Sequence, residues 1–211
     1  MLYICAMEEK YADIINRAQE IYMRYGIKSV TMDDMARHLG ISKKTLYKYV
    51  TDKTDLVNKT IENQLENEMC RIKMSAESAK NAIEEHITIS KSVIAQMKNV
   101  QPAVFYDLKK YYPEAWNMYQ CHKHEEVFKT IKDNILSGMK EGLYREDIHP
   151  DVTAMLYIQS VDVLFSDEMV RIMSTYDFPT ILIEKIKYHI YGISTEKGIK
   201  EFKKQLEKLY E

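Results

Sequence analysis

The chain has 211 residues, of which 45% are hydrophobic and 29% are charged, and its formal net charge is −2. This length and composition allow one or two domains with a substantial core. The near-neutral charge excludes a protein that coats nucleic acid in bulk. Only 6 glycines and 4 prolines occur, and strand-like alternation of polar and apolar residues is hard to find. An all-α protein is therefore predicted.

Cysteine usage and the N-terminus indicate a cytoplasmic protein. The three cysteines are odd in number and match no zinc-binding spacing, which favours reduced thiols. No apolar run approaches the roughly 18 residues that a membrane span needs. The first ten residues lack the basic region and long apolar core of a signal peptide. The helical pattern starts only after Met7, so Met7 is a candidate translation start.

The N-terminal part of the chain carries the most informative pattern. A first amphipathic helix is predicted from about residue 9 to residue 25, and Gly26 supplies its stop. Two short helices follow within residues 31–56, joined by a tight turn that requires a positive φ at Gly40. This spacing is that of a helix-turn-helix DNA reader.

Capping residues define the two short helices. Thr31 is predicted to cap the first, with Asp34 as the acid of a capping box. Ser42 is predicted to cap the second, which runs to Tyr49. Five basic residues and one acidic residue give residues 37–53 a local net charge of +4. The second helix offers positive charge for phosphates and short polar groups for base edges through Lys43, Lys44, Thr45, Tyr47, Lys48 and Tyr49.

The rest of the chain is predicted to be helical. Asp52 is expected to cap a helix that continues past Cys70. Later helices are expected at residues 82–99, near residue 105, and at residues 114–140, 151–174, 179–191 and 195–210. The helix that follows Pro150 has ten apolar or aromatic residues among its first fifteen, so it has more than one apolar face.

One of these faces predicts a homodimer. Two copies of this helix and of the helix at residues 179–191 would form a four-helix seam with two-fold symmetry. Asp162 is either a polar residue of this seam or a group in a ligand pocket. The residues predicted to lie in the dimer interface are Leu156, Val163, Leu164, Ile183, Ile186 and Ile190.

Residues 14–56 resemble the tetracycline-repressor (TetR) family of bacterial transcriptional regulators. The resemblance rests on a helix that ends in Tyr25-Gly26 and on the runs Ser29-Val30-Thr31-Met32, Leu39-Gly40-Ile41-Ser42 and Thr45-Leu46-Tyr47. It implies a helix-turn-helix DNA-binding domain at residues 1–52 and a helical domain for effector binding and dimerisation at residues 53–211.

The resemblance also implies the function and the roles of single residues. The implied protein is a homodimeric repressor that leaves a pseudo-palindromic operator when a small apolar effector binds. By matching position, Thr31, Tyr47, Tyr49 and Lys53 are implied to contact phosphates. Lys43, Lys44, Thr45 and Lys48 are implied to face the bases, although Lys44 stands where the family often has Gly or Pro.

Two further groups of residues have alternative interpretations. Cys121, His122, His124 and Glu125 either form a solvated helix face or bind a transition metal. The 16 tyrosines and 13 methionines include candidates for an apolar effector cavity, although helical spacing makes core packing an alternative for each. These candidates are Met97, Phe105, Tyr106, Tyr112, Trp116, Tyr119 and Tyr157.

The sequence does not favour an enzyme and indicates no cofactor. It has no phosphate-binding glycine loop, no nucleophile elbow and no HExxH motif. The expected partners are double-stranded operator DNA, a second copy of the chain and an unidentified small effector. The alternative is a helical protein–protein adaptor without specific DNA binding, which leaves the helix rich in lysine and tyrosine unexplained.

Overall fold

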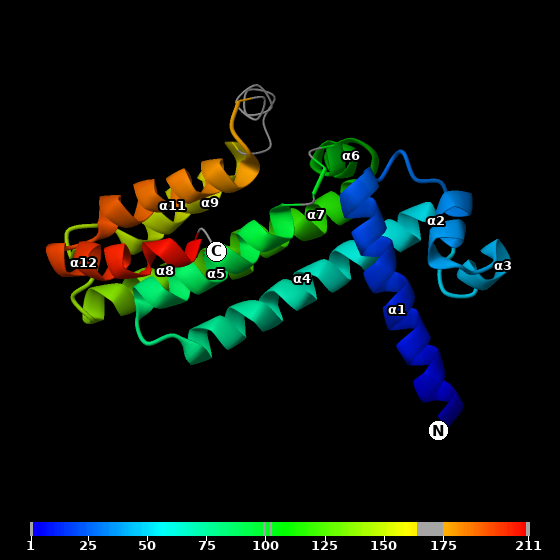
Figure 1. Cartoon of the computed structure of the whole chain (residues 1–211), viewed down its shortest axis with the longest axis horizontal. Helices are drawn as coiled ribbons and strands as arrows, with labels where there is room; N and C mark the ends of the chain where they lie inside the picture. The colour runs from blue at the N-terminus through cyan, green and yellow to red at the C-terminus, as the bar shows by residue number, and fades with distance from the viewer. Residues whose placement is uncertain (1, 99, 102, 164–174, 210–211) are drawn as a thin grey trace. The chain divides into compact units, whose positions relative to one another are not determined.

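The computed structural model describes residues 2–98, 100–101, 103–163 and 175–209. Extended pairing among these residues is limited to an isolated bridge between Tyr144 and Ser194, so the predicted all-α class is confirmed (Figure 1). None of the described helices combines the length and the apolarity that a membrane crossing needs. The helices are α1 (Leu2–Tyr25), α2 (Met32–Leu39), α3 (Lys43–Leu46), α4 (Lys53–Ser78), α5 (Ala82–Met97), α6 (Ala103–Tyr111), α7 (Pro113–His122), α8 (Phe128–Lys140), α9 (Pro150–Val163), α11 (Phe178–Ile193) and α12 (Glu196–Gln205), with a π-helical turn at Lys123–Val127 and a 3₁₀ turn at Leu206–Leu209.

The chain divides into two compact units. Unit 1 comprises Met1–Glu68 and Asn99–Gln120, and unit 2 comprises Met69–Lys98 and Cys121–Glu211. Helix α4 begins in unit 1 and ends in unit 2, so it connects the two covalently. The predicted boundary after residue 52 separates a DNA-binding part of the chain from an effector-binding part, and this functional division stays a prediction.

Unit 1 is built on the apolar stripe of α1. Ile14, Ile15, Ala18 and Tyr22 recur at helical spacing and are almost fully buried. They share a core with residues of α2, α3 and α4. Helix α1 begins at Leu2 rather than near residue 9 as predicted. No glycine or proline occurs among residues 2–8 to interrupt the helix.

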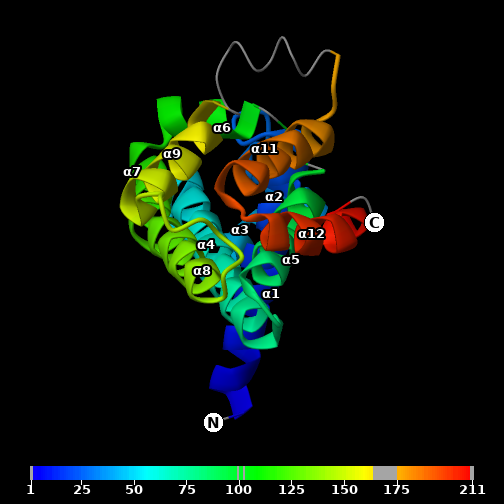
Figure 2. The same cartoon turned by 90° about the vertical axis from the view of Figure 1, so that its left-hand side faces the viewer.

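Unit 2 is a helical bundle around α5. Helices α8, α11 and α12 pack against α5, and α8 also packs against α9, as Figure 2 shows for the same elements. The core includes isoleucines from several helices, namely Ile83, Ile87, Ile94, Ile131, Ile135, Ile183, Ile186, Ile190 and Ile193. The helix predicted at residues 114–140 is helical throughout, but the π-helical turn divides α7 from α8.

A close approach of two residues fixes the end of α8. The Tyr144 ring is fully buried and lies against Gly138, where an added Cβ would come within 2.1 Å of ring carbon Cδ2. The Tyr144 hydroxyl donates a hydrogen bond to Asn134 Oδ1 at 3.2 Å. Only glycine leaves room for this ring, and Gly142 then turns the chain with φ of +68°.

Candidate functional site

A capping box fixes the start of α2. The Asp34 backbone N–H donates to Thr31 Oγ1 at 3.1 Å, and the Thr31 backbone N–H donates to Asp34 Oδ2 at 3.2 Å. The Thr31 hydroxyl also donates to Asp34 Oδ2 at 2.6 Å. These hydrogen bonds from Thr31 hold the pKa of Asp34 below its ordinary value. Both halves of the predicted capping box are therefore present.

The turn between α2 and α3 has the predicted left-handed residue. Gly40 adopts φ of +69°, and its N–H donates to the carbonyls of Ala36 and Arg37 at the end of α2. Ala36 and Leu46 are buried beside the turn. The small side chain of Ala36 allows the close packing of the two helices that the turn requires.

Helix α3 is shorter than predicted. Ser42 caps it by accepting the Thr45 N–H at 3.0 Å, but the α-helix ends at Leu46 rather than at Tyr49. The Lys48 N–H donates to the Thr45 carbonyl at 3.2 Å, and the Tyr49 N–H donates to the Leu46 carbonyl at 3.0 Å. These bonds span three residues, so the last turn tightens and redirects the side chains beyond Leu46.

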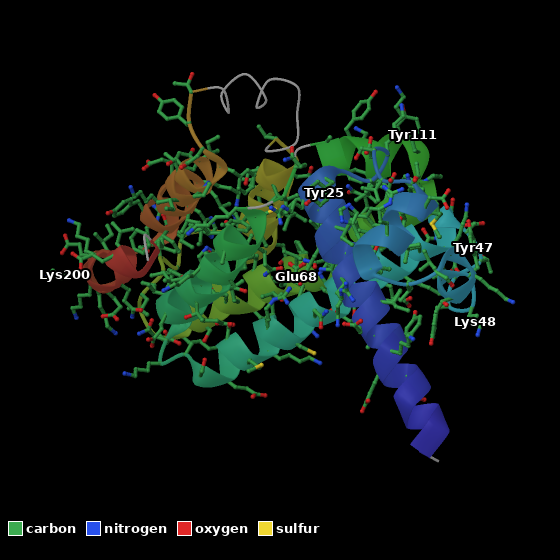
Figure 3. All side chains as sticks on the ribbon, turned by 45° about the vertical axis from the view of Figure 1, so that its right-hand side comes forward. Tyr25, Tyr47, Lys48, Glu68, Tyr111 and Lys200 are labelled. Carbon is green, nitrogen blue, oxygen red and sulfur yellow. The ribbon has the colours of Figure 1, made fainter. Side chains whose placement is uncertain are left out.

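The outer face of α3 and of the turn that follows it is basic and open to solvent. Lys44 and Lys48 are exposed, and the Tyr47 side chain is 42% exposed. Figure 3 shows Tyr47 and Lys48 extending outward from the turn after α3. Lys43 is also exposed, but its ammonium pairs with Asp33 at 3.0 Å, and that hydrogen bond raises the pKa of Lys43. Lys44 and Lys48 thus present positive charge at the surface that the helix-turn-helix exposes.

Tyr49 and Lys53 contact the body of unit 1. Tyr49 is partly buried against the core, and its carbonyl accepts a hydrogen bond from Lys59 Nζ at 3.0 Å. Lys53 Nζ donates to the Lys28 carbonyl at 3.3 Å, and burial lowers the pKa of Lys53. The predicted cap of α4 is present, because Asp52 accepts the Asp55 N–H at 2.9 Å.

Helix α6 adds basic and aromatic residues that the sequence analysis did not place near the helix-turn-helix. Lys28 Nζ donates to the Tyr111 hydroxyl at 3.0 Å, and the buried Asp107 accepts the Lys28 backbone N–H at 2.7 Å. Lys110 Nζ donates to the Tyr106 hydroxyl at 2.6 Å. About 80 residues separate Lys28 from this helix, so no local pattern predicts the contact.

Known proteins similar to this chain identify its family. Residues 14–60 match the family described as bacterial regulatory proteins, tetR family. The uncharacterized HTH-type transcriptional regulator YvaF of Bacillus subtilis (strain 168) is 30% identical over 142 residues, which make up 66% of this chain and 73% of the relative. The chain belongs to the TetR family. It is therefore a transcriptional regulator with a helix-turn-helix DNA-binding domain, and not an enzyme.

Solved structures share the TetR fold with this chain. A TetR-family regulator from Agrobacterium tumefaciens has a TM-score of 0.71 and 15% identity, covering 89% of this chain and 99% of that one. A transcriptional regulator from Saccharomonospora viridis, solved in complex with choline, has a TM-score of 0.69 and 16% identity, covering 90% and 100%. At these identities the likeness concerns the fold alone.

The structure distributes the seven predicted effector residues over both units of this TetR protein. Met97 and Tyr157 belong to unit 2, and the other five belong to unit 1. In unit 1 the Trp116 and Tyr119 ring centroids lie 5.5 Å apart, and Phe105 and Tyr119 lie 6.1 Å apart. Tyr106 is 55% exposed, whereas Tyr112 is buried. Apart from the exposed Tyr106, these aromatic residues of α6, α7 and the residue between them form part of the packing of unit 1.

The predicted dimer residues lie in three kinds of environment. Leu156 and Val163 on α9 are 66% and 53% exposed. Leu164 lies outside the described residues, and the side chain of Asp162 is likewise not described. The three predicted residues of α11 are buried in the core of unit 2 itself, namely Ile183, Ile186 and Ile190.

The cysteine and histidine residues near the π-helical turn do not form a metal site within the described residues. No group of three histidine, cysteine, aspartate or glutamate side chains in that part of the chain could hold a metal ion. Cys121 is exposed as a free thiol, and His124 and Glu125 are exposed beside it. His122 is partly buried, so the exposed face includes only three of the four residues of the predicted group.

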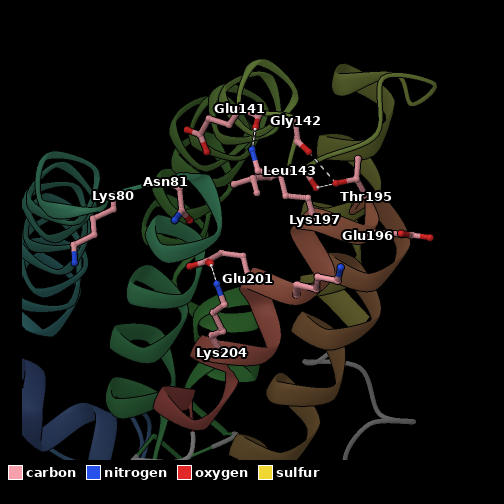
Figure 4. Close-up of a pocket in the computed structure, with 11 residues that line it drawn as sticks. Lys80, Asn81, Glu141, Gly142, Leu143, Thr195, Glu196, Lys197, Glu201 and Lys204 are labelled. Carbon is pink, nitrogen blue, oxygen red and sulfur yellow. Dashed lines mark hydrogen bonds and ion pairs between the residues drawn. The ribbon is translucent and has the colours of Figure 1, made fainter.

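A groove of about 920 Å³ opens on unit 2 between the starts of α5 and α12 (Figure 4). Lys204 pairs with Glu201 at 3.2 Å, and Lys197 Nζ donates to the Glu141 carbonyl at 2.7 Å. Most residues that line this groove are polar or charged, whereas the sequence analysis expected an apolar effector cavity. The lining residues are Lys80, Asn81, Glu141, Gly142, Leu143, Thr195, Glu196, Lys197, Lys200, Glu201 and Lys204.

Proposed function

We propose that this TetR protein is a cytoplasmic, homodimeric repressor that binds a pseudo-palindromic operator and leaves it when a small effector binds. The observation that carries the proposal is the solvent-exposed basic surface of α3 and the turn after it, where Lys44, Tyr47 and Lys48 are exposed beside a fully capped α2. A major-groove helix needs this combination of charge and short polar groups.

Within this proposal the predicted DNA residues have separate roles. Lys44, Thr45 and Lys48 reach base edges or the phosphates beside them, and Tyr47 contacts phosphate or sugar. Ser42 and Thr31 position the two helices through their caps. Lys43 must exchange Asp33 for a phosphate when DNA binds. Lys53, Tyr49 and the backbone near them hold the start of α4 against the DNA backbone.

The exposed apolar stripe of α9 supports the homodimer. Val152, Met155, Leu156 and Val163 are 43–66% exposed and recur at intervals of three, four and seven residues, so they lie along one face of the helix. A stripe of this kind is costly on a monomer and suits an isologous interface, in which the same patch of each copy is buried.

Effector binding is proposed for the C-terminal part of the chain, residues 53–211, and DNA binding for residues 1–52. The fold neighbour from Saccharomonospora viridis carries choline, which supports a small-molecule site in this architecture. Helix α4 runs from the DNA-binding unit into the other unit. An effector that favours one position of α4 would shift the dimer between binding and non-binding states.

A gel-shift experiment on the DNA upstream of the protein's own gene tests the proposal. We expect a specific shift that weakens steeply as salt rises. Light scattering on the same sample is expected to give twice the mass of one chain. A double variant Lys44→Glu/Lys48→Glu should lose the shift, and Lys200→Glu on α12 is the matched control. Unshifted DNA with folded wild-type protein would favour the adaptor alternative.

A further inference from the structure

Unit 2 contains a cluster of polar side chains contributed by α5, α9 and α11, of which the α5 members are buried and the others partly buried. His86 is 3% exposed, and its ring centroid lies 5.4 Å from those of Tyr157 and His189. The Tyr157 and His189 centroids are 4.6 Å apart. Lys185 lies one helical turn before His189 on α11. We call His86, Ser90, Tyr157, Lys185 and His189 the His–Lys cluster.

The ammonium group of Lys185 has no counter-ion among the described residues. Its nitrogen is shielded from solvent and has no hydrogen-bond partner there. It lies over the Tyr157 ring, 3.3 Å from the centroid, and this cation–π contact is the stabilising interaction that the cluster provides. Lys187 on the same helix behaves differently, because it forms an ion pair with Glu184 at 2.7 Å.

The other members of the His–Lys cluster offer neutral hydrogen-bonding groups. Burial and the nearby Lys185 charge lower the pKa of His189 to about 3, and burial likewise takes the pKa of His86 well below its ordinary value. Both imidazoles are therefore neutral at physiological pH. His86 Nε2 is buried without a partner among the described residues, and the Tyr157 hydroxyl has a hydrogen bond with Ser90.

Burial also lowers the pKa of Lys185 to about 7. A lysine in this state is ready to accept a proton when an anion arrives, because a nearby negative charge favours the ammonium form. The same three helices also carry buried aliphatic residues, namely Ile83, Ile87, Ile158, Leu182, Ile186 and Ile190.

We propose that the His–Lys cluster binds the carboxylate of a small amphipathic organic acid. The carboxylate would pair with the Lys185 ammonium and accept hydrogen bonds from His86 and Tyr157, while the apolar part of the acid packs among the aliphatic residues. A single cation with neutral donors matches a monoanion better than a dianionic phosphate. The inference rests on the proposed function, since it assigns a chemical class to the effector.

Isothermal titration calorimetry with matched ligands tests this assignment. Decanoate and 4-phenylbutyrate are compared with their primary amides at pH 8, in two buffers of different ionisation enthalpy. We expect each acid to bind at least tenfold more tightly than its amide. We also expect binding to take up nearly one proton per acid, because Lys185 is mostly neutral at pH 8 before the carboxylate arrives.

Two variants on α11 give the test its specificity. Lys185→Met should abolish both the preference for the acid and the proton uptake, whereas Lys187→Met should change neither. If Lys185→Met does not fold, the proton uptake of the wild-type protein still tests the assignment. The assignment is overturned if neither acid binds, if the amides bind equally well, or if binding takes up no proton.

Gel shifts with the same acids separate this inference from the proposed function. Release of the upstream DNA by an acid, lost in Lys185→Met, supports both. Acid binding that depends on Lys185 but leaves DNA bound supports the carboxylate site and contradicts its role as the effector site. Normal DNA binding together with no acid binding overturns the carboxylate site and leaves the DNA-binding proposal intact.

Discussion

The two units treat polar side chains in opposite ways. In the helix-turn-helix of unit 1, exposed hydroxyls and carboxylates such as Thr31, Ser42 and Asp34 form short-range caps, and the exposed lysines stay in solvent. In unit 2 the Lys185 ammonium is shielded, and cation–π attraction of about 2 kcal/mol offsets only part of a desolvation cost of several kcal/mol. The helix caps of unit 1 stabilise the fold. The shielded ammonium of unit 2 destabilises it until a ligand supplies an anionic partner.

The largest expected effect is a gain in stability from removing the Lys185 charge. Lys185→Met should raise the free energy of unfolding by about 2–5 kcal/mol at pH 7, because each pKa unit of a depressed lysine corresponds to about 1.4 kcal/mol. Urea denaturation of both proteins measures the difference. A lower stability for Lys185→Met would show that the ammonium is satisfied and would remove the contrast between the units.

The pH dependence of this gain follows from the lowered pKa. Below pH 7 both the folded and the unfolded wild-type chains hold the Lys185 proton, so its cost is fully present. Between pH 7 and about 10.5 only the unfolded chain holds the proton, so wild-type stability rises and the advantage of Lys185→Met shrinks. If the stability gained by Lys185→Met does not change between pH 7 and pH 10, improved packing and not removal of the charge causes the gain.

The second effect tests how tightly the core of unit 2 is packed around Tyr144. Gly138→Ala should destabilise the chain by about 1–3 kcal/mol, because its Cβ meets the buried Tyr144 ring at 2.1 Å. Gly192→Ala on α11 is the matched control, since no neighbouring atom lies within 4 Å of its Cβ. It should be neutral or slightly stabilising. Equal Tm values for the two variants would contradict this packing.

The smallest expected effect tests the exposed caps of unit 1. Thr31→Ala removes the side chain that accepts the Asp34 N–H and should cost about 1 kcal/mol of unfolding free energy. Thr88→Ala, whose hydroxyl donates within the middle of α5, makes a comparison outside any cap. If both substitutions have the same small effect, the capping box contributes nothing beyond an ordinary surface hydrogen bond.

Features of this protein that depend on neighbouring residues could be predicted from its sequence. The capping box at Thr31, the positive φ at Gly40 and the cap at Ser42 each involve residues three to five positions apart. The end of α3 was predicted wrongly, because helical periodicity alone cannot show where three-residue hydrogen bonds tighten a last turn.

Features that depend on packing could not be predicted. Trp116 and Tyr157 were both predicted to lie on helices and to line one effector cavity, yet they belong to different units. Ile186 had the expected apolar spacing for a dimer face, but packing within unit 2 already buries it. The His–Lys cluster combines His86 and Lys185, which lie 99 positions apart on two different helices. No spacing in the sequence predicts that these two residues lie close together in the fold.

The most direct test of DNA recognition is fluorescence anisotropy of the upstream DNA, titrated with protein at several salt concentrations. The double variant Lys44→Ala/Lys48→Ala should bind more weakly than wild type. If both lysines contact phosphate, the slope of log K against log salt should fall by about 1.8 units, because each lost contact removes about 0.9. Lys200→Ala should leave the slope unchanged. An unchanged affinity and slope in the double variant would contradict the assignment of α3 as the DNA-reading helix.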